Sequence, residues 1–103
     1  MRQTVAMATP LDNDQRTALA SDHPAWTITG EEVSRTFEFA DFNEAMGFVN
    51  RVALAAEKAD HHPDIDIRWN KVALTLTTHS ADSLTDNDAE LVATIDSWQA
   101  GDG

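Results

Sequence analysis

The sequence predicts an α+β protein, a two-layer sandwich in which helices pack on one face of a four-stranded antiparallel sheet. Three observations lead to this prediction. Two pairs of short segments with alternating polarity each predict a β-hairpin. Three helical segments stand before, between and after these hairpins. Only one connection is long enough for a parallel crossover, so an antiparallel sheet is favoured. The expected order is α-β-β-α-β-β-α.

A short helix is expected near the amino end of the chain. Asp12 followed by Gln15 forms a capping box, in which each side chain accepts a hydrogen bond from the other residue's backbone amide. This pattern predicts a helix over residues 13–21. His23-Pro24 ends it, because the residue before a proline is pushed out of the helical region. His23 itself is expected to be a solvated loop histidine.

The first hairpin follows this helix. Strands are predicted over residues 26–29 and 33–39, where β-forming and alternating side chains occur, and Gly30 favours a turn between them. Arg35 has the same parity as the apolar residues of the second strand. A charged residue at that parity indicates a bulge or a strand at the edge of the sheet.

The longest helix is expected over residues 42–59. Asp41 and Glu44 form a second capping box directly before it. Apolar side chains then recur at spacings of three and four, which places them on one helical face. The residues of this stripe are Phe42, Ala45, Met46, Val49, Val52, Ala53 and Ala56. The helix is expected to end at the His-His-Pro sequence that follows.

A second hairpin and a last helix complete the order. Residues 65–69 and 72–77 alternate between apolar and polar side chains, which predicts two half-buried strands joined by a tight connection. Thr85 and Asp88 have the spacing of a capping box and predict the start of the last helix.

Length and composition limit the class of protein. A chain of 103 residues is expected to form one domain, with its core at about residues 11–99 and frayed ends at 1–8 and 100–103. The absence of cysteine excludes disulfides, thiolate zinc sites and cysteine nucleophiles. Residues 1–10 lack the apolar run of a secretory signal, and no segment has the roughly 18 to 20 apolar residues of a membrane-spanning helix. We therefore expect a cytoplasmic protein with no membrane partner.

The net charge is strongly negative. Eighteen acidic residues stand against seven basic ones, which gives a net charge of −11. Such a surface repels phosphate backbones, so a nucleic acid is not an expected partner. Adaptation to high intracellular salt is favoured over simple solubility as the explanation, because counterions would screen the self-repulsion.

The candidate chemical groups are histidines at the ends of predicted elements. His61 and His62 follow the long helix, and His79 follows the last strand. Imidazole exchanges protons near neutral pH, since its usual pKa is about 6.5. Three histidines can also bind zinc, although two adjacent histidines lack the spacing of common ligand pairs. The residues alone leave an acid/base cluster, a zinc site and solvated loop histidines open.

Two roles are open for each of three further side chains. Asp88 is expected to cap the last helix, and orientation of a histidine or a ligand is the alternative role. Trp26 and Trp69 are expected in the core or in an interface, although either ring can stack on a flat heterocycle.

Three motifs carry a family resemblance. They are AEKADHHP at residues 56–63, WNKV at residues 69–72 and LTTH at residues 76–79. Together with residues 37–54 and the start of the last helix, they make nearly the whole domain similar to the pterin-4a-carbinolamine dehydratase family. The resemblance implies an α+β unit with a four-stranded antiparallel sheet, in agreement with the predicted elements.

The resemblance also implies a reaction. Members of this family dehydrate a 4a-hydroxytetrahydropterin to the quinonoid dihydropterin without a metal or a cofactor, and they recycle the pterin oxidised by aromatic amino acid hydroxylases. It implies that His61 and His79 form the acid/base pair and that His62 mainly positions the pterin. The implied auxiliary and substrate-binding residues are Glu57, Asp88 and Trp69.

Partners follow from the same resemblance. It implies a small-molecule pterin substrate and a homodimer or homotetramer. Two other functions stay open as alternatives. One is a non-catalytic module, as in family members that are dimerisation partners of a homeodomain transcription factor. The other is a different pterin-related, molybdopterin-related or assembly role.

Overall fold

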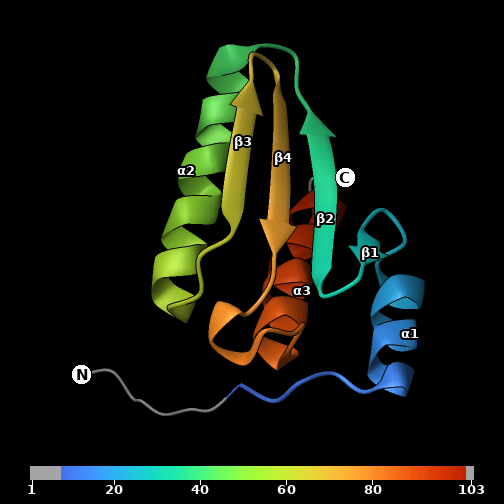
Figure 1. The fold of residues 1–103 in the computed structure, drawn as a ribbon. Coiled ribbons are helices and arrows are strands. Elements are labelled where there is room, and N and C mark those ends of the chain that lie inside the picture. The colour runs from blue at the N-terminus through green and yellow to red at the C-terminus, as the bar shows by residue number, and fades with distance from the viewer. Residues whose placement is uncertain (1–7, 102–103) are drawn as a thin grey trace.

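The structure, a computed structural model, describes residues 8–101. Its elements, shown in Figure 1, confirm the predicted fold class and order. They are α1 (Asn13–Asp22), β1 (Thr27–Thr29), β2 (Glu32–Glu38), α2 (Phe42–Ala59), β3 (Asp64–Arg68), β4 (Lys71–Leu76), the short 3₁₀ helix η1 (His79–Ala81) and α3 (Asp86–Gly101). Helix α3 extends two residues beyond the expected core, to Gly101. Residues 1–7 and 102–103 lie outside the described residues.

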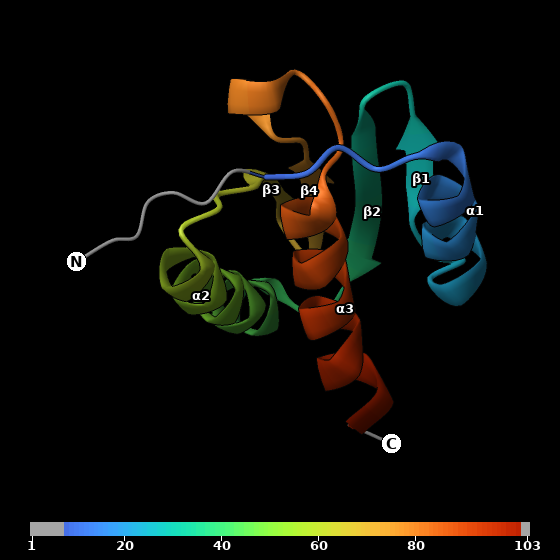
Figure 2. The ribbon, with the colours of Figure 1, turned by 90° about the horizontal axis from the view of Figure 1, so that it is seen from below.

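The sheet is antiparallel throughout and has the strand order β1-β2-β4-β3. In the central pair, Val33 of β2 lies opposite Leu76 of β4, and Glu38 lies opposite Lys71. Helices α2 and α3 lie on one face of the sheet, and α1 lies beyond the β1 edge (Figures 1 and 2). The strands therefore bury one face, as a two-layer arrangement requires.

The core lies between the sheet and the helices. The buried side chains include Val33, Phe37, Ala45, Phe48, Val52, Val72, Leu74, Leu76, Leu91, Val92 and Ile95. Trp26 belongs to the same cluster, which settles its place. The predicted stripe of α2 was partly wrong, because Phe42 and Ala53 are exposed and Phe48 is buried. Within residues 8–101, no helix combines the length and the apolar character needed to cross a membrane.

Arg35 lies neither at a bulge nor at an edge. Strand β2 is an inner strand, and its register with β4 is continuous through Arg35. The Arg35 guanidinium donates to Asp96 of α3 at 3.0 Å and lies 4.3 Å from the centre of the Phe37 ring. Asp96 also accepts hydrogen bonds from Trp26 Nε1 at 2.8 Å and from His23 Nδ1 at 2.7 Å. His23 is therefore half-buried and paired, and the expectation of a solvated histidine was wrong.

Trp69 lies in a turn and not in a strand. Arg68 pairs with Lys71, so Trp69 and Asn70 form the two-residue connection between β3 and β4. Trp69 has a positive φ of 53° and is 65% exposed. The buried Asn70 side chain donates to the carbonyl of Phe39 at 2.8 Å, which ties this turn to the end of β2. The alternation that placed Trp69 in a strand therefore ends one residue earlier.

Candidate functional site

His61 is positioned by the way α2 ends. Asp60 has a left-handed backbone conformation with φ 54°, and its amide donates to the carbonyls of Ala56 and Glu57. The His61 amide also donates to the Ala56 carbonyl, at 3.0 Å. These bonds satisfy carbonyls at the helix end and turn the chain sharply. His61 is left with 9% of its surface exposed.

Asp88, in the first turn of α3, forms a hydrogen bond with the His61 ring. Its side chain is fully buried, and its Oδ1 lies 2.5 Å from His61 Nε2. Its Oδ2 accepts from the Thr78 hydroxyl at 2.8 Å and from the Thr85 amide at 2.9 Å. The bond from the Thr85 amide is one of the two bonds of the predicted capping box; in place of the other, the Asp88 amide donates to the Thr85 carbonyl. Asp88 thus caps the helix and also orients a histidine, the two roles that the sequence left as alternatives.

The hydrogen bonds around Asp88 have one consistent direction. The Asn87 amide donates to Thr85 Oγ1 at 3.2 Å, and Thr85 Oγ1 lies 2.7 Å from Thr78 Oγ1. Because Thr78 gives its single hydroxyl proton to Asp88, Thr85 must donate to Thr78. A carboxylate only accepts hydrogen bonds, so this network assigns the hydrogen of His61 to Nε2. In the neutral ring, Nδ1 then keeps a lone pair that can accept a proton.

His62 and Glu57 form a second pair at the surface. His62 Nε2 lies 2.5 Å from Glu57 Oε1, and the two side chains are 57% and 76% exposed. An ion pair this exposed contributes little to stability. It does limit the directions that the His62 ring can take.

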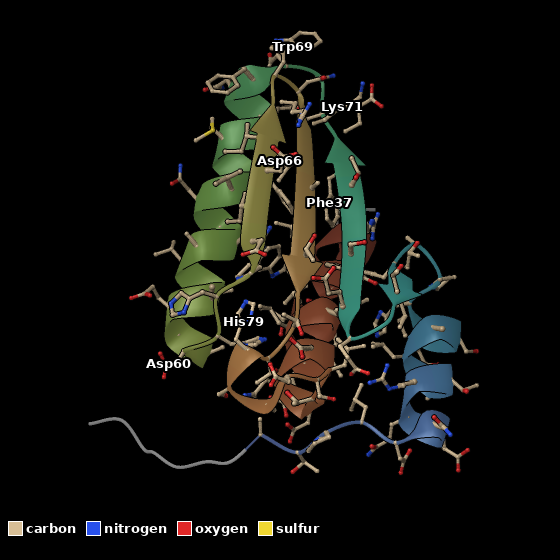
Figure 3. All side chains as sticks on the ribbon, in the orientation of Figure 1. Phe37, Asp60, Asp66, Trp69, Lys71 and His79 are labelled. Carbon is tan, nitrogen blue, oxygen red and sulfur yellow. The ribbon has the colours of Figure 1, made fainter. Side chains whose placement is uncertain are left out.

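His79 opens η1 directly after Thr78 and is exposed. Its ring has no hydrogen bond to another side chain of residues 8–101. Figure 3 shows His79 at the same end of the molecule as Asp60, the neighbour of His61. One carboxylate, that of Asp88, binds both the His61 ring and the Thr78 hydroxyl. The structure therefore brings the His61 and His79 segments together.

Trp69 is not brought to this end within one chain. Figure 3 shows it at the opposite end of the β3–β4 hairpin from His79. Strand β4, which has 6 residues, separates the two positions. A strand of that length spans roughly 20 Å.

A groove of about 370 Å³ lies beside His61, between α2 and α3. Its lining is Ala55, Lys58, Ala59, His61, Asn87, Glu90, Leu91 and Thr94. This volume is within the range of small-molecule sites. Among the described residues, no three histidine, aspartate or glutamate side chains are grouped closely enough to hold a metal ion.

The Thr78 hydroxyl has no role in the sequence-based prediction, in which Thr78 is only part of the LTTH motif, although its bond to Asp88 joins the His61 and His79 segments. The Thr85 hydroxyl, expected as part of a capping box, bonds the Thr78 hydroxyl and the Asn87 amide. A hydroxyl next to a histidine at the end of a strand is a weak signal. The role of the Thr78 hydroxyl is visible only in the structure, where α3 places the Asp88 carboxylate within hydrogen-bond distance of it.

The fold and the site together define a class of protein, a small α+β unit in which a buried carboxylate orients a histidine at one end of an antiparallel sheet. The sequence model of one family, described as pterin 4 alpha carbinolamine dehydratase, matches residues 9–98. The chain belongs to this family of lyases, as the resemblance in the sequence predicted.

Relatives agree with this membership. The chain is 52% identical over 91 residues to a protein of Nocardia farcinica that is named provisionally as a pterin-4-alpha-carbinolamine dehydratase, with 87% of this chain and 96% of the relative covered. A protein of the same provisional name from Acidobacterium capsulatum is 49% identical over 92 residues, with 89% and 97% covered.

Solved structures agree as well. A transcriptional coactivator/pterin dehydratase from Brucella melitensis superposes with a TM-score of 0.81 at 32% identity, over 86% of this chain and 97% of that one. A pterin dehydratase-like RuBisCO assembly factor of the α-carboxysome has a TM-score of 0.58 at 19% identity, over 70% and 83% of the two chains, and shows the shared fold alone.

Proposed function

We propose that this chain dehydrates a 4a-hydroxytetrahydropterin to the quinonoid dihydropterin and so recycles the pterin used in aromatic amino acid hydroxylation. Membership of the family supports the reaction class and a pterin substrate. The observation that carries the proposal is the ordered set of hydrogen bonds around Asp88, which leaves Nδ1 of His61 able to accept a proton.

The reaction needs an acid and a base at once. The C4a–O bond breaks, and the hydroxyl group takes a proton and leaves as water. The N5–H bond also breaks, and its electron pair forms the double bond between N5 and C4a while the proton goes to a base. Hydroxide is a poor leaving group, so proton donation to it lowers the barrier. One imidazole gains a proton and the other loses one, and exchange with water restores both.

The two roles are assigned by environment. His61 is the base, because Asp88 holds its Nε2–H and stabilises the imidazolium that forms when Nδ1 accepts the N5 proton. His79, the other member of the pair, is then the acid, and its exposed ring can regain its proton from water. His62, held by Glu57, positions the pterin. Trp69 remains a sequence-based prediction, since one chain does not bring it to the histidines.

The test is a stopped-flow assay of 4a-hydroxytetrahydropterin breakdown. The wild-type rate should exceed the buffer blank and should be the same with and without a chelator. His61→Ala and His79→Ala should each lower the rate by about a hundredfold or more. His23→Ala, in which a histidine far from the site is removed, is the control and should keep the wild-type rate. A wild-type rate equal to the blank would leave a non-catalytic binding role.

A further inference from the structure

The position of His79 depends on the backbone of its loop. This loop leaves β4 after Leu76 and reaches α3 through Leu84. Inside it, the Thr78 amide donates to the Ser83 carbonyl at 3.1 Å, and the Ser83 amide returns a bond to the Thr78 carbonyl at 3.4 Å. This pairing closes the loop but does not fix its direction relative to the sheet. Contacts with residues outside 77–84 do so, and one of them is the bond from the Thr78 hydroxyl to Asp88 of α3.

Glu31, in the turn between β1 and β2, bonds to both ends of this loop. On one side, the Thr77 hydroxyl donates to the Glu31 carbonyl at 2.6 Å. On the other, Glu31 Oε1 accepts from the Ser83 hydroxyl at 3.0 Å and from the Leu84 amide at 3.2 Å. The two bonded segments are the ones that directly flank residues 78–82.

Arg16 of α1 holds the Glu31 carboxylate in place. Its guanidinium donates through Nη2 to Glu31 Oε1 and through Nη1 to the Gly30 carbonyl at 2.9 Å. One carboxylate oxygen therefore collects three donors, of which two belong to the loop. The Arg16 guanidinium, together with the Ser83 hydroxyl and the Leu84 amide, also holds the pKa of Glu31 below its usual value, so the accepting form is present at neutral pH.

These contacts differ from those of a core residue. The Glu31 side chain is 52% exposed and is not among the buried polar side chains of the described residues. Its bonds order a loop at the end of the sheet where His79 lies (Figure 3). An acid or base must stay within hydrogen-bond reach of its proton, and a displacement of about 1 Å can cost a hundredfold in rate.

We propose that Glu31 is a positioning residue for His79, whose carboxylate holds residues 77–84 in the conformation that presents this histidine to the substrate. The proposal rests on the proposed function, because it gives His79 a part in the dehydration. Glu31 does not touch the substrate, so its loss should lower kcat and leave KM within about twofold.

The test compares Glu31→Ala with Glu32→Ala, a neighbouring exposed glutamate whose side chain makes no such bond within the part of the chain that the structure describes. Glu31→Ala should lower kcat by about tenfold to a hundredfold, and Glu32→Ala should keep the wild-type value. Glu31→Gln keeps an acceptor oxygen and should recover part of the loss. Amide exchange at Leu84 should become at least about tenfold faster in Glu31→Ala and stay unchanged in Glu32→Ala.

A double-mutant cycle separates positioning from general stability. If Glu31 acts through His79, Glu31→Ala should have no further effect on kcat in a His79→Ala background. An equal further loss there would overturn the proposal, as would a wild-type kcat in Glu31→Ala. In both cases the dehydratase activity would still stand. If the wild-type rate equals the buffer blank, the proposed function itself is wrong, and the proposed role of Glu31 in catalysis is wrong as well.

Ser83→Ala, which removes one donor and no charge, provides a second variant in case Glu31→Ala does not fold. It should lower kcat by less than Glu31→Ala does.

Discussion

At the scale of single residues, Asp88 links stability to the proposed catalysis by His61. In Asp88→Asn, the carbonyl oxygen of the amide should face the donors of Thr78 and Thr85, which leaves its NH₂ group toward His61. That group donates, so the hydrogen of the ring should move to Nδ1 and the base should be lost. We expect kcat to fall by about a hundredfold or more, while the unfolding free energy changes by about 1 kcal/mol. Stopped-flow kinetics and urea unfolding measure the two quantities.

Asp88→Ala tests the contribution of Asp88 to stability. It leaves three buried donors without an acceptor and should cost about 3 kcal/mol of unfolding free energy. Asp86→Asn is the matched control, since Asp86 lies in the same turn and its side chain, among residues 8–101, accepts only from the Thr9 amide. It should change the unfolding free energy by about 1 kcal/mol or less and leave kcat alone. A normal kcat in Asp88→Asn would contradict the assignment of His61 as the base.

Glu31 gives stability a dependence on pH. Its pKa in the folded protein is below the usual value of 4.5, chiefly because of the Arg16 guanidinium. A lowered pKa means that the folded state favours the carboxylate. The stabilisation is therefore present above the usual value and is lost as the pH falls through the folded value. The difference in Tm between the wild type and Glu31→Gln should be largest near neutral pH and should shrink on acidification below about pH 4.5. A difference that grows on acidification would show that the sign is wrong.

At the scale of elements, local patterns predicted the order and most of the bounds, because capping boxes and alternation are properties of neighbouring residues. Helix α2 was predicted over residues 42–59 and occupies Phe42–Ala59. The bulge or edge position predicted for Arg35 was wrong, because local patterns do not show partners that are distant in the sequence. Arg35 can point to the helix side of the sheet because it pairs with Asp96, which is 61 positions away.

The candidate site shows the same division. The motifs located the histidines at the ends of elements, and the sequence left Asp88 as a helix cap or as a residue that orients a histidine or a ligand. Its bond to His61 and the anchoring of the loop by Glu31 depend on how α3 and the β1–β2 turn pack against β4. Such contacts join residues 27 or more positions apart, so spacing in the sequence could not reveal them.

The polar cluster at Asp96 ties α3 to α1, β1 and β2. Asp96→Ala should leave the side chains of Arg35, Trp26 and His23 without their acceptor in a half-buried place. We expect the unfolding free energy to fall by about 2 kcal/mol in urea unfolding, after allowance for partial solvent screening. Thr94→Ala, on the exposed side of the same helix, should change it by about 0.5 kcal/mol or less. An equal loss in the two variants would show that the cluster contributes nothing of its own.

At the scale of the whole molecule, two expectations concern charge and association. The expected homodimer or homotetramer stays a prediction that light scattering can decide. A domain of this size exposes much of its surface, which is a general reason for association. The net charge of −11 also places many like charges on a small surface. Their repulsion opposes folding, and it falls as the Debye length shortens from about 10 Å at 0.1 M salt to about 3 Å at 1 M.

Salt should therefore stabilise this protein. We expect Tm to be higher in 1 M KCl than in dilute buffer, by about 5 °C or more, because screening removes repulsion that is present mainly in the compact state. A variant with the exposed Asp14, Asp22 and Asp64 changed to asparagine is the control, since it carries three fewer negative charges. Its Tm should be higher in dilute buffer and should gain less from KCl, whereas a general salting-out effect on apolar surface would raise both proteins equally. If Tm in KCl is no higher than in dilute buffer, adaptation to salt does not explain the acidic composition.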